Sequence, residues 1–153
     1  MGQAIQFTTP SDHYDFRKEK GCCILWCTDA RFTPALDKFV AERGYMRYDL
    51  IRIAGGANVL ATPEGDGARF VIGQFGALHN LHHFDSIILM MHQDCGACGG
   101  SKAFGDDCAR ELQDLNLRLS TACKAVRDSL PSIKVETVLV TFKEIISIPQ
   151  PVL

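Results

Sequence analysis

Along the chain, segments with the apolar pattern of a strand alternate with segments that have the apolar spacing of a helix. Residues 21–27 and 85–92 are short continuous apolar runs, which are typical of strands covered on both faces. Residues 48–54 and 133–142 alternate between apolar and other side chains, the pattern of a strand with one buried face. The sequence therefore predicts four strands before a proline-containing tail.

Between the strands, apolar residues return every three or four positions, which predicts helices that bury one face. The first helix has Thr33 as its cap and Pro34 at its first helical position, and it ends at Gly44. The last is a long amphipathic segment that Pro131 closes. The predicted helices are residues 33–44, 68–83 and 108–130.

Strands that alternate with helices build a mostly parallel sheet, because each crossover helix returns the chain to the same end of the sheet. We therefore expect an α/β fold with a central sheet of four or five strands flanked by helices. The whole chain, residues 1–153, is predicted to be a single domain. Ligands bind beyond the carboxyl ends of the strands in open sheets of this kind, so a site is expected at that edge.

The composition is 46% apolar and 22% charged, as in an ordinary globular protein, and the net charge is -2. The lysines and arginines are scattered, so neither nucleic acid nor an anionic membrane is an expected partner. We find no apolar run long enough for a signal peptide or a membrane span. A cytoplasmic location is the resulting expectation.

The chain contains seven cysteines. Their odd number and the lack of an export signal argue against a disulfide framework, because the cytosol keeps thiols reduced. Metal binding, catalysis or burial must therefore account for them. Four lie in predicted strands or helices, where a small buried apolar residue is the expected role. These four are Cys22, Cys23, Cys108 and Cys123.

Two short motifs place reactive side chains at the ends of predicted strands. CTDAR begins at Cys27, where the first strand ends, and HQDC runs from His92 to Cys95 after the third. Arg52 lies near the end of the second strand, so the topology brings all three segments to one edge. Two thiolates and an imidazole suit zinc, and three protein ligands leave a fourth position for water or substrate. The sequence thus predicts a zinc site.

Two charged residues of the first motif have a predicted role beside the metal. Two thiolates cancel the charge of a zinc ion, so a nearby group must help a hydroxide to form. Asp29 can accept a hydrogen bond from that hydroxide, and Arg31 can hold Asp29 through a bidentate contact. If Arg31 releases it, the same carboxylate can bind the zinc and close the site.

CTDAR together with HQDC resembles the C-x-D-x-R and H-x-x-C pair of the beta-class carbonic anhydrases. The resemblance implies that Cys27, His92 and Cys95 bind zinc and that Asp29 and Arg31 form a catalytic dyad. It implies reversible hydration of carbon dioxide to bicarbonate, by attack of zinc-bound hydroxide on the carbon. It also implies a homodimer or a larger homo-oligomer, with the active site near the subunit interface.

The segment RIAGGAN resembles the R-N-A-G-N segment of the same family, and we expect Arg52, Gly55 and Gly56 to shape the wall of the substrate pocket. Ile53 stands where asparagine is usual, and Met91 stands where a glycine usually precedes the ligand histidine. The upstream glutamine that helps to hold bicarbonate in the family has no counterpart. Hydrolysis of carbonyl sulfide or carbon disulfide, and a non-catalytic zinc-binding role, are therefore alternatives.

Three further features allow other interpretations. Cys95 and Cys98 form a C-x-x-C pair, which in a cytosolic protein can be a thiol redox site without metal. His79 and His83 lie one helical turn apart but lack the glutamate of H-E-x-x-H, so a polar helix surface is the more ordinary interpretation. Three aromatic residues are candidates for the approach to the site or for the core: Phe32, Phe70 and Phe75.

Overall fold

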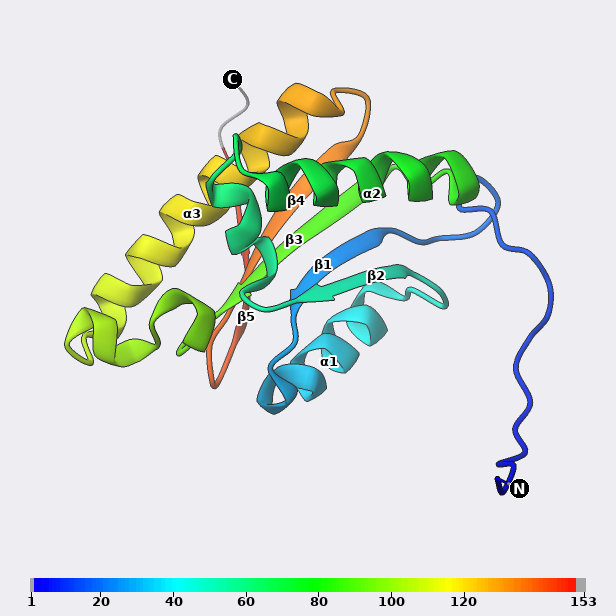
Figure 1. Ribbon diagram of the computed structural model, residues 1–153, viewed down its shortest axis with the longest axis horizontal. Helices are drawn as coiled ribbons and strands as arrows, with labels where there is room; N and C mark the ends of the chain where they lie inside the picture. Colours follow the sequence, from blue (N-terminus) through cyan, green and yellow to red (C-terminus); the bar gives the residue numbers. More distant parts are fainter. Residues whose placement is uncertain (1, 151–153) are drawn as a thin grey trace.

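The computed structural model describes residues 2–150, in which five strands form one sheet. The strands are β1 Cys23–Cys27, β2 Asp49–Ile53, β3 Ser86–His92, β4 Lys134–Val140 and β5 Ile145–Ile148. They are ordered β2-β1-β3-β4-β5 across the sheet (Figure 1). The first four are parallel to their neighbours, and β5 runs antiparallel to β4.

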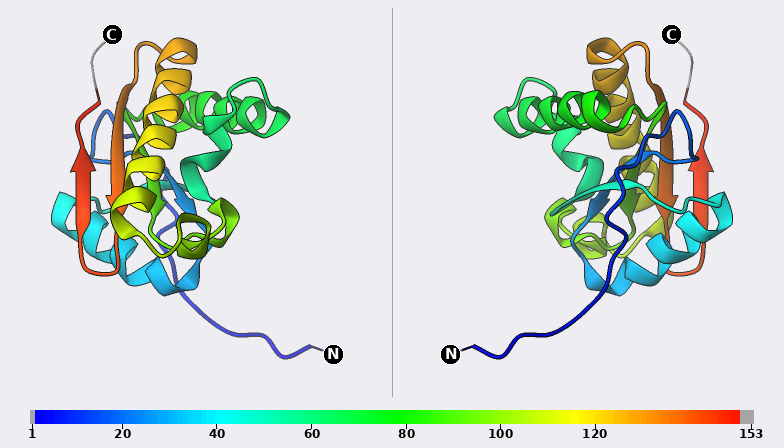
Figure 2. Two further views of the ribbon diagram at one scale, coloured as in Figure 1. Left: turned by 90° about the vertical axis from the view of Figure 1, so that its left-hand side faces the viewer. Right: turned by 90° about the vertical axis from the view of Figure 1, so that its right-hand side faces the viewer.

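Three α-helices cover the sheet: α1 Thr33–Arg43, α2 Asp66–His82 and α3 Cys108–Ser129. Helices α2 and α3 lie over one face and α1 lies on the other (Figure 1 and Figure 2). Helix α1 carries Pro34 in its first turn and is capped by Gly44, whose φ of 69° suits glycine. The molecule thus has three layers, as the alternation of strands and helices predicts.

The middle strands are buried on both faces because their side chains alternate between two cores. In β1, Cys23 and Leu25 pack with α2 and α3, whereas Ile24 and Trp26 pack with α1. Strand β3 repeats this alternation, and every residue of both strands is buried. Strands with two buried faces are continuous apolar runs in the sequence, which is why their pattern does not alternate.

The strand order changes direction at β1. The chain passes from β1 through α1 to β2 on one side, and then from β2 through α2 to β3 on the other side of β1. Because the two crossovers use opposite faces of the sheet, their loops separate at the carboxyl ends of β1 and β3. Cys27 and His92 are the last residues of these two strands.

The predicted α/β fold with a mostly parallel sheet is confirmed. Strand β5, however, follows the last predicted strand in a segment for which the sequence predicts no element, just before the proline-containing tail, and α2 begins at Asp66 rather than at residue 68. The predicted burial of Cys108 is wrong, because this residue opens α3 ahead of the turns that pack on the sheet. The other three cysteines predicted to be buried are buried.

Among residues 2–150, we find no helix with the length and apolar character needed to cross a membrane. Helix α3 has 22 residues, but only one of its faces is apolar. The cytoplasmic location and the single domain stay predictions.

Candidate metal centre

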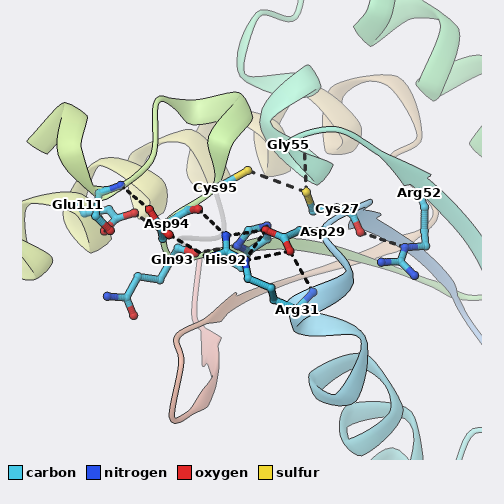
Figure 3. Close-up of polar contacts among 11 residues, drawn as sticks. Cys27, Asp29, Arg31, Arg52, Gly55, His92, Gln93, Asp94, Cys95 and Glu111 are labelled. Carbon is cyan, nitrogen blue, oxygen red and sulfur yellow. Dashed lines mark hydrogen bonds and ion pairs between the residues drawn. The ribbon is translucent and has the colours of Figure 1, made fainter. Parts of the chain in front are cut away.

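The carboxyl ends of β1 and β3 bring three metal-ligating side chains together. Cys27 closes β1, His92 closes β3, and Cys95 lies in the turn that follows. One ligand atom of each lies within 4.8 Å of the other two, and the two sulfur atoms are 3.9 Å apart (Figure 3). Two sulfurs that bind one zinc at about 2.3 Å with a tetrahedral angle lie about 3.8 Å apart. The spacing of the sulfurs therefore fits a tetrahedral ion.

His92 is fully buried, and neighbouring groups fix the orientation of its ring. Nδ1 lies 2.7 Å from the carbonyl oxygen of Gln93, to which it donates, so Nε2 carries the lone pair. Phe32 stacks on the ring at 4.2 Å between centroids, and Trp26 packs edge-on at 5.6 Å. Among residues 2–150, Nε2 is a buried nitrogen without a hydrogen-bond partner. A buried lone pair beside two sulfurs is suited to bind a metal.

A backbone amide and a guanidinium hold Cys27. The amide of Gly55 donates to its Sγ over 3.4 Å, and Nε of Arg52 donates to its carbonyl oxygen over 3.0 Å. Gly56 passes so close that a Cβ there would lie 2.6 Å from the carbonyl oxygen of Met90, and its φ of +54° also favours glycine. The structure thus places the three predicted pocket residues against the Cys27 segment.

Asp29 and Arg31 form a forked ion pair beside the three candidate ligands. Nε of Arg31 lies 3.1 Å from each carboxylate oxygen, and Nη2 lies 2.7 Å from Oδ2. The hydrogen bonds from Arg31 lower the pKa of Asp29 to about 2, so the carboxylate is ionised at neutral pH. Its Oδ2 is 3.9 Å from Nε2 of His92. The carboxylate therefore lies next to the ligand cluster while Arg31 holds it.

A second carboxylate, which the sequence motifs do not single out, contacts Arg31 from the other side. Nη1 donates to Oδ2 of Asp94 over 2.9 Å, and Nη2 donates to the carbonyl oxygen of Asp94 over 3.0 Å. Buried Glu111 accepts a hydrogen bond from the backbone amide of Asp94 over 2.6 Å. The sequence does contain a signal for Glu111, because this charge lies in the apolar stripe of α3 with Leu115 and Leu119.

Cys98 is a third thiol near the site, half-buried and outside the three-residue cluster. Its hydrogen bond with Cys95, together with burial, raises the pKa of Cys95 to about 11, and the same bond lowers the pKa of Cys98. A redox pair would also require this contact. It would not require Cys27 and His92 to meet Cys95, and their convergence favours a metal site.

The remaining candidate residues divide between the site and the rest of the fold. Phe32 lies at the site, where it stacks on the candidate ligand histidine. Phe75 is buried in the core, and Phe70 is 65% exposed on the outer surface of α2. His79 lies in α2 and His83 caps its end, and within residues 2–150 they join no cluster of three potential metal ligands.

No protein-family model matches the sequence, and no curated protein matches it either. The solved structures that are similar in fold include two from fungi. One comes from a study of two tetrameric beta-carbonic anhydrases of the filamentous ascomycete Sordaria macrospora, with a TM-score of 0.57 and 16% identity over 83% of this chain and 79% of that chain. The other is the beta-carbonic anhydrase CafA of the fungal pathogen Aspergillus fumigatus, with a TM-score of 0.52 and 15% identity over 85% of this chain and 76% of that chain.

These alignments cover at least 76% of each chain, so the likeness extends over the sheet and its flanking helices. It agrees with the resemblance that the two sequence motifs indicate. The chain has the fold of the beta-carbonic anhydrases.

Proposed function

We propose that this protein is a zinc-dependent enzyme that catalyses the reversible hydration of carbon dioxide to bicarbonate. The observation that carries the proposal is the convergence of Cys27, His92 and Cys95, with the ionised Asp29 beside them, at the edge where open α/β sheets bind ligands. The likeness of the fold to beta-carbonic anhydrases supports it.

The donor set suits zinc, because thiolates and imidazole are the ligands that this borderline-soft ion prefers. A zinc ion here would supply the Lewis acidity that makes a water molecule nucleophilic near neutral pH. Cys27 and Cys95 would bind it as thiolates, with release of their protons. His92 would bind through Nε2, since Nδ1 already donates to a carbonyl oxygen.

In this proposal, Asp29 orients the attacking water by accepting a hydrogen bond from it. Because its pKa is about 2, Asp29 stays an acceptor over the physiological range and does not store the proton that the reaction releases. Arg31 holds both carboxylate oxygens and so fixes the direction of the acceptor. The released proton must leave through buffer or another group.

The proposal extends to the partners and the location of the protein. The proposed substrate is a small uncharged molecule, carbon dioxide. We propose a homo-oligomer because α2 exposes two large apolar side chains, Phe70 and Leu81, at 65% and 66%. The Sordaria macrospora proteins are tetrameric. Neither nucleic acid nor a membrane is a proposed partner, and the proposed location is the cytoplasm.

Stopped-flow measurement of carbon dioxide hydration with a pH indicator tests the proposed activity. We expect the zinc-loaded protein to exceed the buffer rate, a chelator to abolish the excess, and added zinc to restore it. If the zinc-loaded protein is active only on carbonyl sulfide or carbon disulfide, that molecule and not carbon dioxide is the substrate. Inactivity on all three would leave a zinc-binding protein without catalysis. A metal-free protein with a Cys95 to Cys98 disulfide after mild oxidation would instead indicate a redox function.

A further inference from the structure

The Asp-x-Arg fork at the candidate metal centre has a counterpart elsewhere in the chain. Nε of Arg17 lies 3.0 and 3.1 Å from the two carboxylate oxygens of Asp15, and Nη2 lies 2.6 Å from Oδ2. In this fork and in that of Asp29 and Arg31, the backbone amide of the arginine also donates to the aspartate over 3.0 Å. The two-residue spacing therefore builds such a fork without help from a metal site.

The two forks differ at the outer edge of the guanidinium. Arg31 donates there to Oδ2 of Asp94 over 2.9 Å and to its carbonyl oxygen over 3.0 Å (Figure 3). For Arg17, residues 2–150 supply no second carboxylate within ion-pair distance. Arg31 is thus held from two sides although half of its side chain is exposed.

Asp94 is itself held in place by a buried carboxylate. Its φ of 54° lies in the left-handed region, which aspartate tolerates better than most residues. Glu111 accepts the amide of Asp94 over 2.6 Å and the hydroxyl of Ser101 over 2.7 Å, and only 1% of Glu111 is exposed. The amide of Ser101 donates to Oδ1 of Asp94 over 2.9 Å. These contacts form a continuous network from the buried face of α3 to Arg31.

We propose that Asp94 and Glu111 are positioning residues that hold Arg31 on Asp29 and so keep the Asp29 carboxylate off the metal. This inference rests on the proposed function, because it takes the three candidate ligands to hold an ion. An exposed ion pair by itself contributes little and opens readily. Even while Arg31 holds it, Oδ2 of Asp29 lies only 3.9 Å from Nε2 of His92, so a released carboxylate can compete for the open position on the metal. By holding Arg31 in place, Asp94 favours the state in which Asp29 is paired with Arg31 over the state in which Asp29 binds the metal.

Hydrogen exchange of the arginine Nε–H groups, followed by NMR in the metal-free protein, tests the support of Arg31. Arg17 is an internal reference, because its fork lacks the second carboxylate. We expect the Nε–H of Arg31 to exchange more slowly than that of Arg17. The Asp94→Asn substitution should raise the exchange rate of Arg31 by about two- to fivefold and leave the rate of Arg17 unchanged. Asparagine tolerates the left-handed backbone, so this variant keeps the fold. If the Nε–H of Arg31 exchanges at the same rate in Asp94→Asn as in the wild-type protein, the inference is wrong.

The visible spectrum of the cobalt(II)-substituted protein tests the consequence for the metal. We expect Asp94→Asn and Glu111→Gln each to shift the ligand-field bands, and an added Asp29→Asn substitution to return them toward wild type. Asp15→Asn changes the other fork and is the matched control, which should leave the bands in place. Unshifted bands in Asp94→Asn, or a shift that persists without Asp29, would contradict the positioning role.

The two measurements separate this inference from the proposed function. The exchange rates need no metal and no turnover, so they report on the Arg31 support alone. Cobalt binding with bands that do not respond to Asp94 overturns the positioning role and leaves the metal site intact. Failure of the wild-type protein to bind cobalt or zinc overturns the proposed function, and this inference with it.

Discussion

Replacing Cys95 with serine is expected to lower the zinc content of the purified protein from about one ion per chain to nearly none. A serine hydroxyl seldom ionises, so Cys27 and His92 would be left as two ligands for an ion that requires at least three. We expect the loss of zinc affinity to exceed the roughly 100-fold that removal of an outer partner of a ligand can cost. Elemental analysis after equilibration at a fixed free zinc concentration measures the effect.

Cys98→Ser is the matched control for this substitution, because it removes the other thiol of the same C-x-x-C pair. Cys98 lies outside the three-residue cluster, so this variant should keep its zinc. If both variants retain zinc, or if both lose it equally, the assignment of Cys95 as a direct ligand is wrong. Circular dichroism of the metal-free proteins checks that each variant is folded.

Replacing Asp29 with asparagine is expected to reduce carbon dioxide hydration by about 100-fold or more while zinc remains bound. The amide keeps the shape of the carboxylate and can still cap the turn that follows, but it lacks the charge that accepts the hydrogen bond of the attacking water. Stopped-flow rates and elemental analysis on the same preparation separate the loss of turnover from a loss of metal.

Asp15→Asn is the control for Asp29→Asn, because Asp15 makes the same fork with Arg17 away from the ligands. It should leave both zinc and activity unchanged. An Asp29→Asn protein that hydrates carbon dioxide at the wild-type rate would remove Asp29 from the mechanism. Loss of zinc together with activity would instead assign Asp29 to metal binding.

The lowered pKa of Asp29 also fixes the pH range in which its protonation matters. The ion pair of Asp29 contributes fully to the free energy of unfolding at a pH above the pKa of an aspartate in the unfolded chain, near 4. This contribution is lost as the pH falls toward 2, the pKa of Asp29 in the folded protein. Changes in activity between about pH 5 and 9 must therefore come from other groups.

The sequence predicts the main elements of the fold because their signals are local. The two central strands are continuous apolar runs since both of their faces are buried, and Pro34 and Gly44 mark the ends of α1. Strand β5 is missed because it has four residues and no fully buried position, and only its pairing with β4 makes it a strand. That pairing depends on tertiary structure, which local pattern does not report.

The convergence of the site was predictable for a similar reason. Cys27 and His92 end adjacent parallel strands, so topology alone brings them to one edge. The support of Arg31 was not predictable, because it depends on the left-handed backbone of Asp94 and on a contact with Glu111 from a distant helix. An isolated charge on the apolar face of an amphipathic helix is the one sequence feature that points to it.

The two Asp-x-Arg forks show why this short motif is weak evidence by itself. Asp15 and Arg17 reproduce the fork of Asp29 and Arg31 with nearly the same distances, yet within residues 2–150 no cluster of potential metal ligands includes Asp15. The chemistry proposed for Asp29 therefore depends on what surrounds the fork rather than on the motif.

X-ray absorption at the zinc edge of the zinc-loaded protein tests whether Cys27, His92 and Cys95 bind the ion. We expect two sulfur neighbours at about 2.3 Å and at least one imidazole nitrogen at about 2.0 Å, with a light atom completing four neighbours. A third sulfur neighbour, a site made of nitrogen and oxygen alone, or a protein that takes up no zinc would contradict this assignment.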